Sequence, residues 1–223
     1  MKRHKQISAA QHVRRRFNAK GSLTLRWARL ISFFVVALAL TQVPGPAKTV
    51  QEVTPDEYAI YSRLIQHFDL TGQPLVITSA TSVDDEKDLL RNDVLRHLTR
   101  EFPSPSSKAN ADFKAKNARS FDLERKLPGV TSYALVPRGE LDKLWDNCTQ
   151  AKQDCGWELF YSKYPNSSGI VTLSRVGFTS TGEDALVYLG NRRHWKSGTG
   201  YLVLLHKNGE EWDIVKSVVV WMS

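Results

Sequence analysis

The chain has 223 residues, enough for one or at most two domains. Its formal net charge of +8 at first suggests a nucleic-acid or membrane partner, but residues 1–47 carry nine of the 31 Lys and Arg and no Asp or Glu. The remaining residues hold 22 basic and 23 acidic side chains, a balance that excludes the strongly basic surface expected of a nucleic-acid-binding groove.

Residues 1–47 are typical of an export signal or an N-terminal membrane anchor. A basic segment precedes the apolar run Leu30–Leu40, which fits a signal-peptide core and is shorter than the roughly 20 residues that span a bilayer. The small residues of Gly45-Pro46-Ala47 predict cleavage after Ala47. The unusual length of the basic segment leaves three explanations open: a start codon placed too early, an uncleaved anchor through residues 30–43, or a twin-arginine signal at Arg14–Phe17.

The location of the body, residues 48–223, follows from this leader. Basic residues before the apolar run keep that end in the cytoplasm, so the body is expected in the periplasm or outside the cell, or held at the inner membrane with the body outside the cytoplasm. A cytoplasmic protein is the remaining alternative. The two cysteines, Cys148 and Cys155, agree with export, because a lone pair so close in sequence is expected to form a disulfide in an oxidising compartment. A zinc site or a reactive thiol is less well supported, since no CxxC motif and no nearby His accompany them.

The body begins with a well-marked helix. Thr54-Pro55-Asp56-Glu57 combines an N-cap residue, a proline at the first helical position and a glutamate that closes a capping box. Apolar residues then recur at helical spacing as far as Phe68, and Gly72 is expected to end the helix. Residues 74–81 predict a short strand.

Weaker signals fill the middle of the body. A second helix is expected from about residue 82 to Phe102, with acidic residues in its first turn. Residues 108–123 predict a weaker helix or a mixed segment, residues 132–136 a strand, and Leu141–Trp145 a short helix. Four aromatic residues between Trp157 and Tyr164 form a dense cluster.

The last quarter of the chain predicts a four-stranded antiparallel meander. The strands are expected at about 170–178, 185–192, 201–207 and 212–221, with a strong hairpin signal at Asn208-Gly209. Each connection is too short for a crossover helix, which requires antiparallel order. The expected fold is therefore α+β, a single domain with N-terminal helices packed on one face of this sheet and one or two small strands upstream.

Arg175 is the most unusual residue of the meander. Side chains alternate along a strand, so it should share a face with Val171 and Leu173 at the end of an apolar stripe. An unpaired buried charge is costly, and Glu183 or Asp184 in the following turn is the first candidate partner. A structural ion pair that joins the first hairpin to a helix is the leading interpretation, with an anionic-ligand site or a plain exposed arginine as alternatives.

Several spaced motifs resemble one group of proteins. The segments EYAIYSRLI, PLVITSAT, DFKAKN, GWELFYSKYPNS and the C-terminal run from SGIVTLSRVGF to WMS are similar to those of uncharacterised exported bacterial proteins, in the same order. The resemblance covers the body from about Glu57 onwards and implies no activity and no catalytic residue. The segment Asn191–Gly200 departs from the group because it is more basic and bulkier than the expected Gly-rich run.

No motif in the sequence predicts a catalytic residue, a cofactor or a metal site. His194 and Trp195 lie in an expected loop that is a candidate for binding an anion or a carbohydrate, although a solvated loop explains them as well. The leading hypothesis is a non-enzymatic exported domain that binds an envelope partner or a small ligand. The alternatives are an exported hydrolase whose acid–base site is assembled by the fold, and an inhibitor or immunity-type protein with Asn191–Gly200 as its protruding loop.

Overall fold

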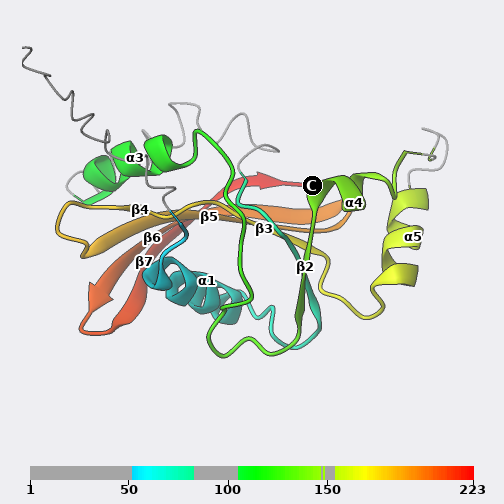
Figure 1. The fold of residues 1–223 in the computed structure, drawn as a ribbon, viewed down its shortest axis with the longest axis horizontal. Coiled ribbons are helices and arrows are strands. Elements are labelled where there is room, and N and C mark those ends of the chain that lie inside the picture. Colours follow the sequence, from blue (N-terminus) through cyan, green and yellow to red (C-terminus); the bar gives the residue numbers. More distant parts are fainter. Residues whose placement is uncertain (1–51, 83–104, 147, 149–153) are drawn as a thin grey trace, which may run out of the picture. The chain divides into compact units, whose positions relative to one another are not determined.

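The computed structural model describes residues 52–82, 105–146, 148 and 154–223, which belong to one compact unit, Thr49–Ser223. Its fold is α+β, as predicted, with helices packed on a mixed sheet (Figure 1). The helices are α1 (Pro55–His67), α3 (Pro105–Lys116), α4 (Arg138–Asp142) and α5 (Cys155–Lys163). The strands are β1 (Leu75–Thr78), β2 (Tyr133–Val136), β3 (Ile170–Leu173), β4 (Gly177–Phe178), β5 (Asp184–His194), β6 (Ser197–Asn208) and β7 (Glu211–Met222).

The sheet is larger than the predicted meander and is not purely antiparallel. Its strand order is β2-β1-β3-β5-β6-β7, and β4 continues along the β3 edge of β5. The pairs from β3 to β7 are antiparallel, as expected from their short connections. β1 is parallel to both β2 and β3, because helices lie in the connections between these strands. The purely antiparallel prediction therefore holds only for the C-terminal part of the sheet.

The start of α1 follows its sequence signal and its end does not. The Thr54 hydroxyl accepts a hydrogen bond from the Glu57 amide at 3.3 Å, and Glu57 Oε2 accepts one from the Thr54 amide at 2.9 Å, which completes the capping box. The helix ends at His67, before the predicted stop at Gly72. Asp69 follows with a φ of 52°, so an aspartate takes the left-handed position that was expected of glycine.

Helices cover both faces of the sheet, contrary to the expectation of one covered face. The side chains of Ile60, Leu64 and Ile65 from α1 pack with Val171 and Val187 in the main apolar core. On the opposite face, Figure 1 shows α3 over β4 and β5 and the helices α4 and α5 at the end formed by β1 and β2. The sheet has two apolar faces because its strands carry apolar residues at consecutive positions, as in Ala185–Leu189.

A β-bulge separates β3 from β4 and changes the predicted side-chain alternation. Leu173 pairs with Leu189 and Gly177 pairs with Leu186, so three residues oppose two at this point. Val176 therefore joins the α1 face instead of the opposite one. Gly177 faces α3 so closely that a Cβ atom there would overlap the α3 backbone at Ala109 and Phe113, which explains the glycine.

The other predicted helices and strands match the structure to different degrees. α3 starts at Pro105, three residues before the predicted weak helix of residues 108–123, and ends within it at Lys116. β2 matches the predicted strand, and the β6–β7 turn has Gly209 at a φ of 65°. The aromatic cluster of residues 157–164 lies on α5, a helix that the pattern did not predict. The helix expected at 82–102 and the leader 1–47 lie outside the described residues. No helix in the described part of the chain is long and apolar enough to span a membrane.

Candidate functional site

Arg175 lies at the bulge and is fully buried, and its partner is not the predicted one. Its Nε and one terminal nitrogen donate to the two carboxylate oxygens of Glu57 at 2.7 and 2.9 Å, and the same terminal nitrogen donates to the Glu52 carbonyl at 3.1 Å. The guanidinium carbon lies 4.3 Å from the centre of the Phe121 ring. Glu57 belongs to α1, so the charge pair joins that helix to the sheet, and the suggestion of Glu183 or Asp184 as partner was wrong.

The backbone of the bulge is satisfied by side chains. The Val176 amide donates to Glu57 Oε1 at 3.0 Å, and the Arg175 amide donates to Asn117 Oδ1 at 2.8 Å. The Asn117 amide group donates in return to the Arg175 carbonyl at 3.0 Å, and the Tyr188 amide donates to the Ser174 hydroxyl at 2.8 Å. These bonds replace the ladder hydrogen bonds that the bulge removes.

The electrostatics of Glu57 follow from these contacts. Burial alone raises the pKa of the Glu57 carboxyl, but hydrogen bonds from Arg175, Thr54 and Val176 together with the Arg175 charge lower the pKa below its ordinary value. The pair is thus ionised and enclosed, with neither side chain exposed to solvent. A ligand has no access to Arg175, and this cluster is a structural junction between α1, α3 and the sheet.

The remaining predicted site residues do not gather around Arg175. Asp184 begins β5, where its Oδ1 lies 2.8 Å from Nδ1 of His206 on the neighbouring strand. His194 and Trp195 lie at the other end of β5. Their segment is a hairpin instead of the predicted loop, since β5 runs to His194 and β6 begins at Ser197.

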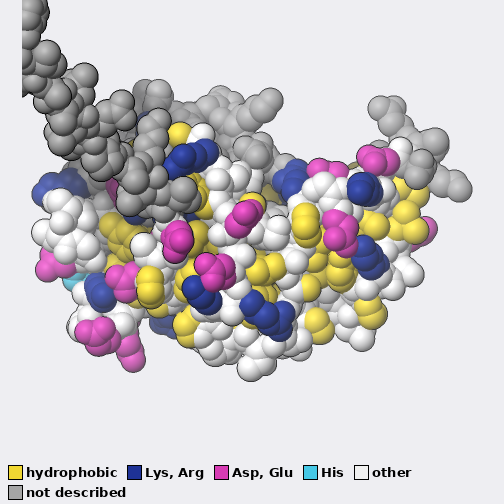
Figure 2. All heavy atoms as spheres, viewed as in Figure 1, with side chains coloured by type: hydrophobic (Ala, Val, Ile, Leu, Met, Phe, Trp, Pro, Cys, Tyr) yellow, Lys and Arg dark blue, Asp and Glu magenta, His cyan; other side chains and the backbone are white. Residues whose placement is uncertain are grey.

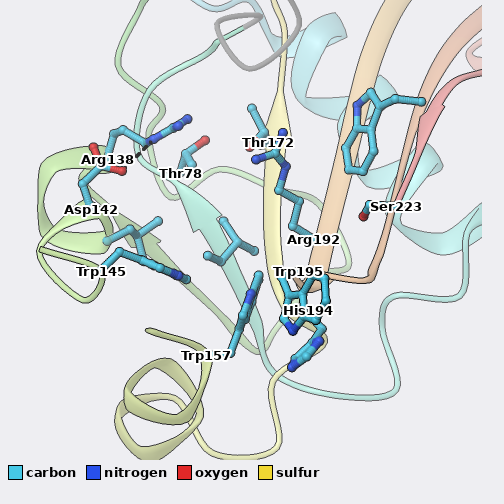
Figure 3. A pocket seen from close by; sticks show the side chains of 13 residues that line it. Thr78, Arg138, Asp142, Trp145, Trp157, Thr172, Arg192, His194, Trp195 and Ser223 are labelled. Carbon is cyan, nitrogen blue, oxygen red and sulfur yellow. Dashed lines mark hydrogen bonds and ion pairs between the residues drawn. The ribbon is translucent and has the colours of Figure 1, made fainter. Parts of the chain in front are cut away.

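A cavity of about 500 Å³ lies beside this hairpin (Figure 3). It is on the sheet face opposite α1, because the lining residue Thr172 alternates along β3 with Val171 and Leu173, which pack on the α1 side. Four tryptophans line it and define what we term the indole pocket: Trp145, Trp157, Trp195 and Trp221. They come from the segment after α4, from α5, from the β5–β6 turn and from β7, respectively. The sequence has six tryptophans in all, so most of them converge on one cavity whose size is ordinary for a small-ligand site.

Polar side chains line the rest of the indole pocket. Arg138 and Asp142, one turn apart on α4, are joined by a hydrogen bond from Nε to Oδ1 at 3.1 Å. In Figure 3, Thr78 and Thr172 lie at the same end of the pocket as Arg138, whereas Trp145 and Trp157 lie toward the other end. The Arg192 guanidinium carbon is 5.0 Å from the centre of the Trp221 ring. The pocket therefore combines a polar end with an apolar aromatic end.

Two glycines make room for the Trp221 wall. A Cβ atom at Gly198 or Gly200 of β6 would overlap the Trp221 ring. The indole nitrogen donates to the Tyr188 hydroxyl at 2.9 Å, which fixes the ring against the sheet. The Gly-rich stretch Gly198–Gly200 thus provides a flat seat for an aromatic side chain.

The Cys148–Cys155 disulfide stabilises the wall of the indole pocket that carries Trp145 and Trp157. Cys148 and Cys155 are bonded, as predicted, with their Cα atoms 5.7 Å apart. The bond joins the segment that carries Trp145 to the first residue of α5. The Trp145 and Trp157 rings meet edge to face with centroids 5.4 Å apart, and Trp145 covers Gly156 so closely that no Cβ would fit there. The cross-link therefore positions two indoles of the pocket.

A single carboxylate fixes both rings at the mouth of the pocket. Asp154 Oδ1 lies 2.8 Å from His194 Nε2 and accepts a hydrogen bond from Trp195 Nε1 at 2.7 Å. Trp195 is 40% exposed, and Lys196 Nζ lies 4.0 Å from its ring centre. An exposed indole that is held in one orientation is suited to stacking on a ligand.

Sequence reasoning found part of this site. His194, Trp195 and the disulfide were identified, and Trp157 was part of the aromatic cluster noted in the sequence. Thr78, Thr172, Arg138 and Arg192 were missed, because no local pattern marks them and only the strand order places them together. The departure of Asn191–Gly200 from the expected Gly-rich run was the available signal for Arg192.

The described residues contain no group of three or more His, Cys, Asp or Glu that could hold a metal ion. Comparison of the chain with protein-family models, with curated proteins and with solved structures found no match. The function must therefore be argued from the indole pocket itself.

Proposed function

We propose that this protein is a non-enzymatic binding domain that holds a small ligand in the indole pocket. The observation that carries the proposal is the convergence of Trp145, Trp157, Trp195 and Trp221 on one cavity of about 500 Å³. The sheet already forms two apolar cores elsewhere in the described part of the molecule, one with α1 and one with α3. Trp157 is buried and packs with Trp145 in a third apolar cluster, but each of the four indoles also lines the cavity, and Trp195 is 40% exposed. Together they provide the apolar surface that ligand sites use.

The pocket can be tested by filling it. Thr172 lies on β3 and lines the pocket, so Thr172→Trp places a large side chain in the cavity without removing a packed residue. A metabolite library screened by ligand-observed NMR should yield ligands that bind the wild-type protein and are lost with Thr172→Trp. Val215→Trp is the matched control, because Val215 is 47% exposed on β7 and does not line the pocket. Equal binding to all three proteins, or no ligand at all, contradicts the proposal.

We further propose that the protein is exported, as a periplasmic or secreted protein or with an uncleaved anchor, and that it belongs to the group of exported bacterial proteins which its motifs resemble. The Cys148–Cys155 bond is compatible with an oxidising compartment. The intact mass of protein purified from its own host tests this proposal. A mass that matches Lys48–Ser223, lower by two hydrogens before reduction, supports cleaved export, and a full-length mass with the bond supports an anchor. A full-length mass with two free thiols contradicts export.

A hydrolase is the second candidate, and the His194–Asp154 contact favours it. A histidine oriented by a carboxylate beside a cavity is an arrangement used in general acid–base catalysis. Among the described residues, however, no hydroxyl or thiol group is hydrogen-bonded to His194, so an activated water would have to act as the nucleophile. Turnover of a panel of ester, amide and glycoside substrates that is lost in His194→Ala, with ligand binding retained, would establish this alternative.

A further inference from the structure

The ligand class can be inferred from the two unlike ends of the indole pocket, and this step rests on the proposed function. A ligand needs an apolar face to contact indoles such as Trp157 and Trp195. It also needs several polar groups to bind at the end of the pocket that holds Arg138 and Thr172 (Figure 3). A fatty chain has no set of polar groups for that end. A planar aromatic acid has two apolar faces and a single anionic group.

The polar end supplies donors and acceptors side by side. The Arg138 guanidinium carries only donors and the Asp142 carboxylate only acceptors, and the two are held 3.1 Å apart. Neighbouring hydroxyl groups each donate and accept, so a pair of them can bond to both side chains at once. The Thr172 hydroxyl adds a group of the same mixed character, and the Thr78 hydroxyl, which donates its proton to the Ala80 carbonyl at 3.2 Å, adds an acceptor.

The aromatic end supplies a fixed platform. The Trp195 indole is held by its hydrogen bond to Asp154 at 2.7 Å, yet 40% of the residue is exposed. The electron-rich face of an indole attracts the polarised C–H groups that form one face of a sugar ring. Because the ring is held in place before binding, little side-chain entropy is lost when a ligand stacks on it.

We infer that the indole pocket binds a carbohydrate, with a sugar ring stacked at the aromatic end and its hydroxyl groups bonded at the polar end. A sugar ring is the small-molecule class that combines an apolar C–H face with a rim of adjacent hydroxyls. The cavity of about 500 Å³ accommodates a short oligosaccharide. The lining carries both signs of charge, with Arg138 bonded to Asp142 and Arg192 beside the Trp221 ring, so the test includes an acidic sugar as well as neutral ones.

The test uses the oxidised protein and defined probes. Cellotriose, maltotriose and chitotriose serve as neutral sugars, trigalacturonate as the acidic sugar, and indole-3-acetate as the aromatic acid. Binding is followed by tryptophan fluorescence and by calorimetry. We expect at least one trisaccharide to bind and Trp195→Ala to weaken it by about tenfold, which is a loss of about 1.4 kcal/mol. Leu159→Ala is the control, because Leu159 is 47% exposed on α5 and does not line the pocket.

The outcomes separate this inference from the proposed function. Binding of any trisaccharide that is weakened by Trp195→Ala and unchanged by Leu159→Ala supports the carbohydrate class, and tighter binding of trigalacturonate identifies an acidic sugar. Binding of indole-3-acetate alone, lost on filling the pocket with Thr172→Trp, overturns the carbohydrate class and leaves the proposed function standing. Failure of every probe and of the metabolite library overturns both.

Discussion

In two regions of the molecule a carboxylate holds neighbouring side chains in place, but one region is buried and the other is open to solvent. At the Glu57–Arg175 junction the carboxylate is enclosed, both of its oxygens are bonded, and both side chains are fully buried. At the mouth of the indole pocket Asp154 is 59% exposed and holds His194 and Trp195 at the edge of a cavity. The junction fixes the fold, whereas the pocket mouth presents side chains to a ligand. Changes at the first region should therefore alter stability, and changes at the second should alter binding.

The largest expected effect is that of Glu57→Gln. This change removes the carboxylate charge that binds the buried Arg175 guanidinium, and breaking a buried ion pair costs about 3–5 kcal/mol of unfolding free energy. Urea denaturation followed by circular dichroism measures it. Glu124→Gln removes an exposed ion pair with Lys126, whose side chain is 61% exposed, and should cost less than about 1 kcal/mol. Similar losses for the two variants would contradict the structural role of the junction.

The next largest expected effect on stability is that of removing the Cys148–Cys155 disulfide, which lies in the wall of the indole pocket. Replacing both cysteines by serine should lower the unfolding free energy by about 2–3 kcal/mol, because the bond closes a short loop in the unfolded chain. It should also weaken ligand binding, since Trp145 and Asp154 flank the cross-link. Adding reductant to the double-serine variant is the control, because the chain has only two cysteines. Unchanged ligand binding after loss of the disulfide would show that the bond does not position the pocket residues.

Strong acid should weaken the Glu57–Arg175 junction. The pKa of Glu57 is lowered in the folded state, so its stabilising contribution is complete above the unfolded value of about 4.3 and is lost as the pH falls through the lower folded value. Denaturation free energies measured from pH about 6 down to pH about 3 should fall steeply at the acid end. Arg175→Met should remove much of that slope, and an unchanged slope would show that other carboxyl groups control acid unfolding.

Local sequence patterns predicted where α1 begins and where the last hairpin turns, whereas the Arg175 junction and the indole pocket depend on contacts between residues far apart in the sequence. Thr54-Pro55-Asp56-Glu57 and Asn208-Gly209 carry their own capping and turn chemistry, so α1 and the last hairpin were predicted from a few residues each. Glu57 and Arg175 are 118 residues apart, and no spacing rule links them. The bulge at Arg175 also places Val176 on the α1 face of the sheet, because one extra residue shifts the side-chain alternation along the strand.

The indole pocket was beyond sequence reasoning for the same reason. Its walls come from β1, the α4–α5 segment, β3, the β5–β6 turn and β7. They meet because β1 pairs in parallel with β3, an order that follows from the intervening helices and not from any strand pattern. Aromatic content alone does not indicate which aromatic residues lie in the core and which face the cavity.

The smallest expected effect on stability, and the most specific on the site, is that of Asp154→Ala. Asp154 precedes α5 and makes no side-chain capping bond, so the change removes only its contacts with His194 and Trp195. Exposed contacts of this kind contribute at most about 1 kcal/mol. The indole N–H of Trp195 loses its acceptor, and its NMR resonance should shift and exchange faster with solvent. Ligand binding should also weaken in Asp154→Ala, because the Trp195 side chain must then be ordered when the ligand binds.

The control is Glu158→Ala, which changes an exposed acidic residue in the first turn of the same helix. It should leave both the Trp195 resonance and the ligand affinity unchanged. A Trp195 resonance that is indifferent to Asp154→Ala would mean that the indole is held by packing alone, and the carboxylate would then have no part in preparing the pocket.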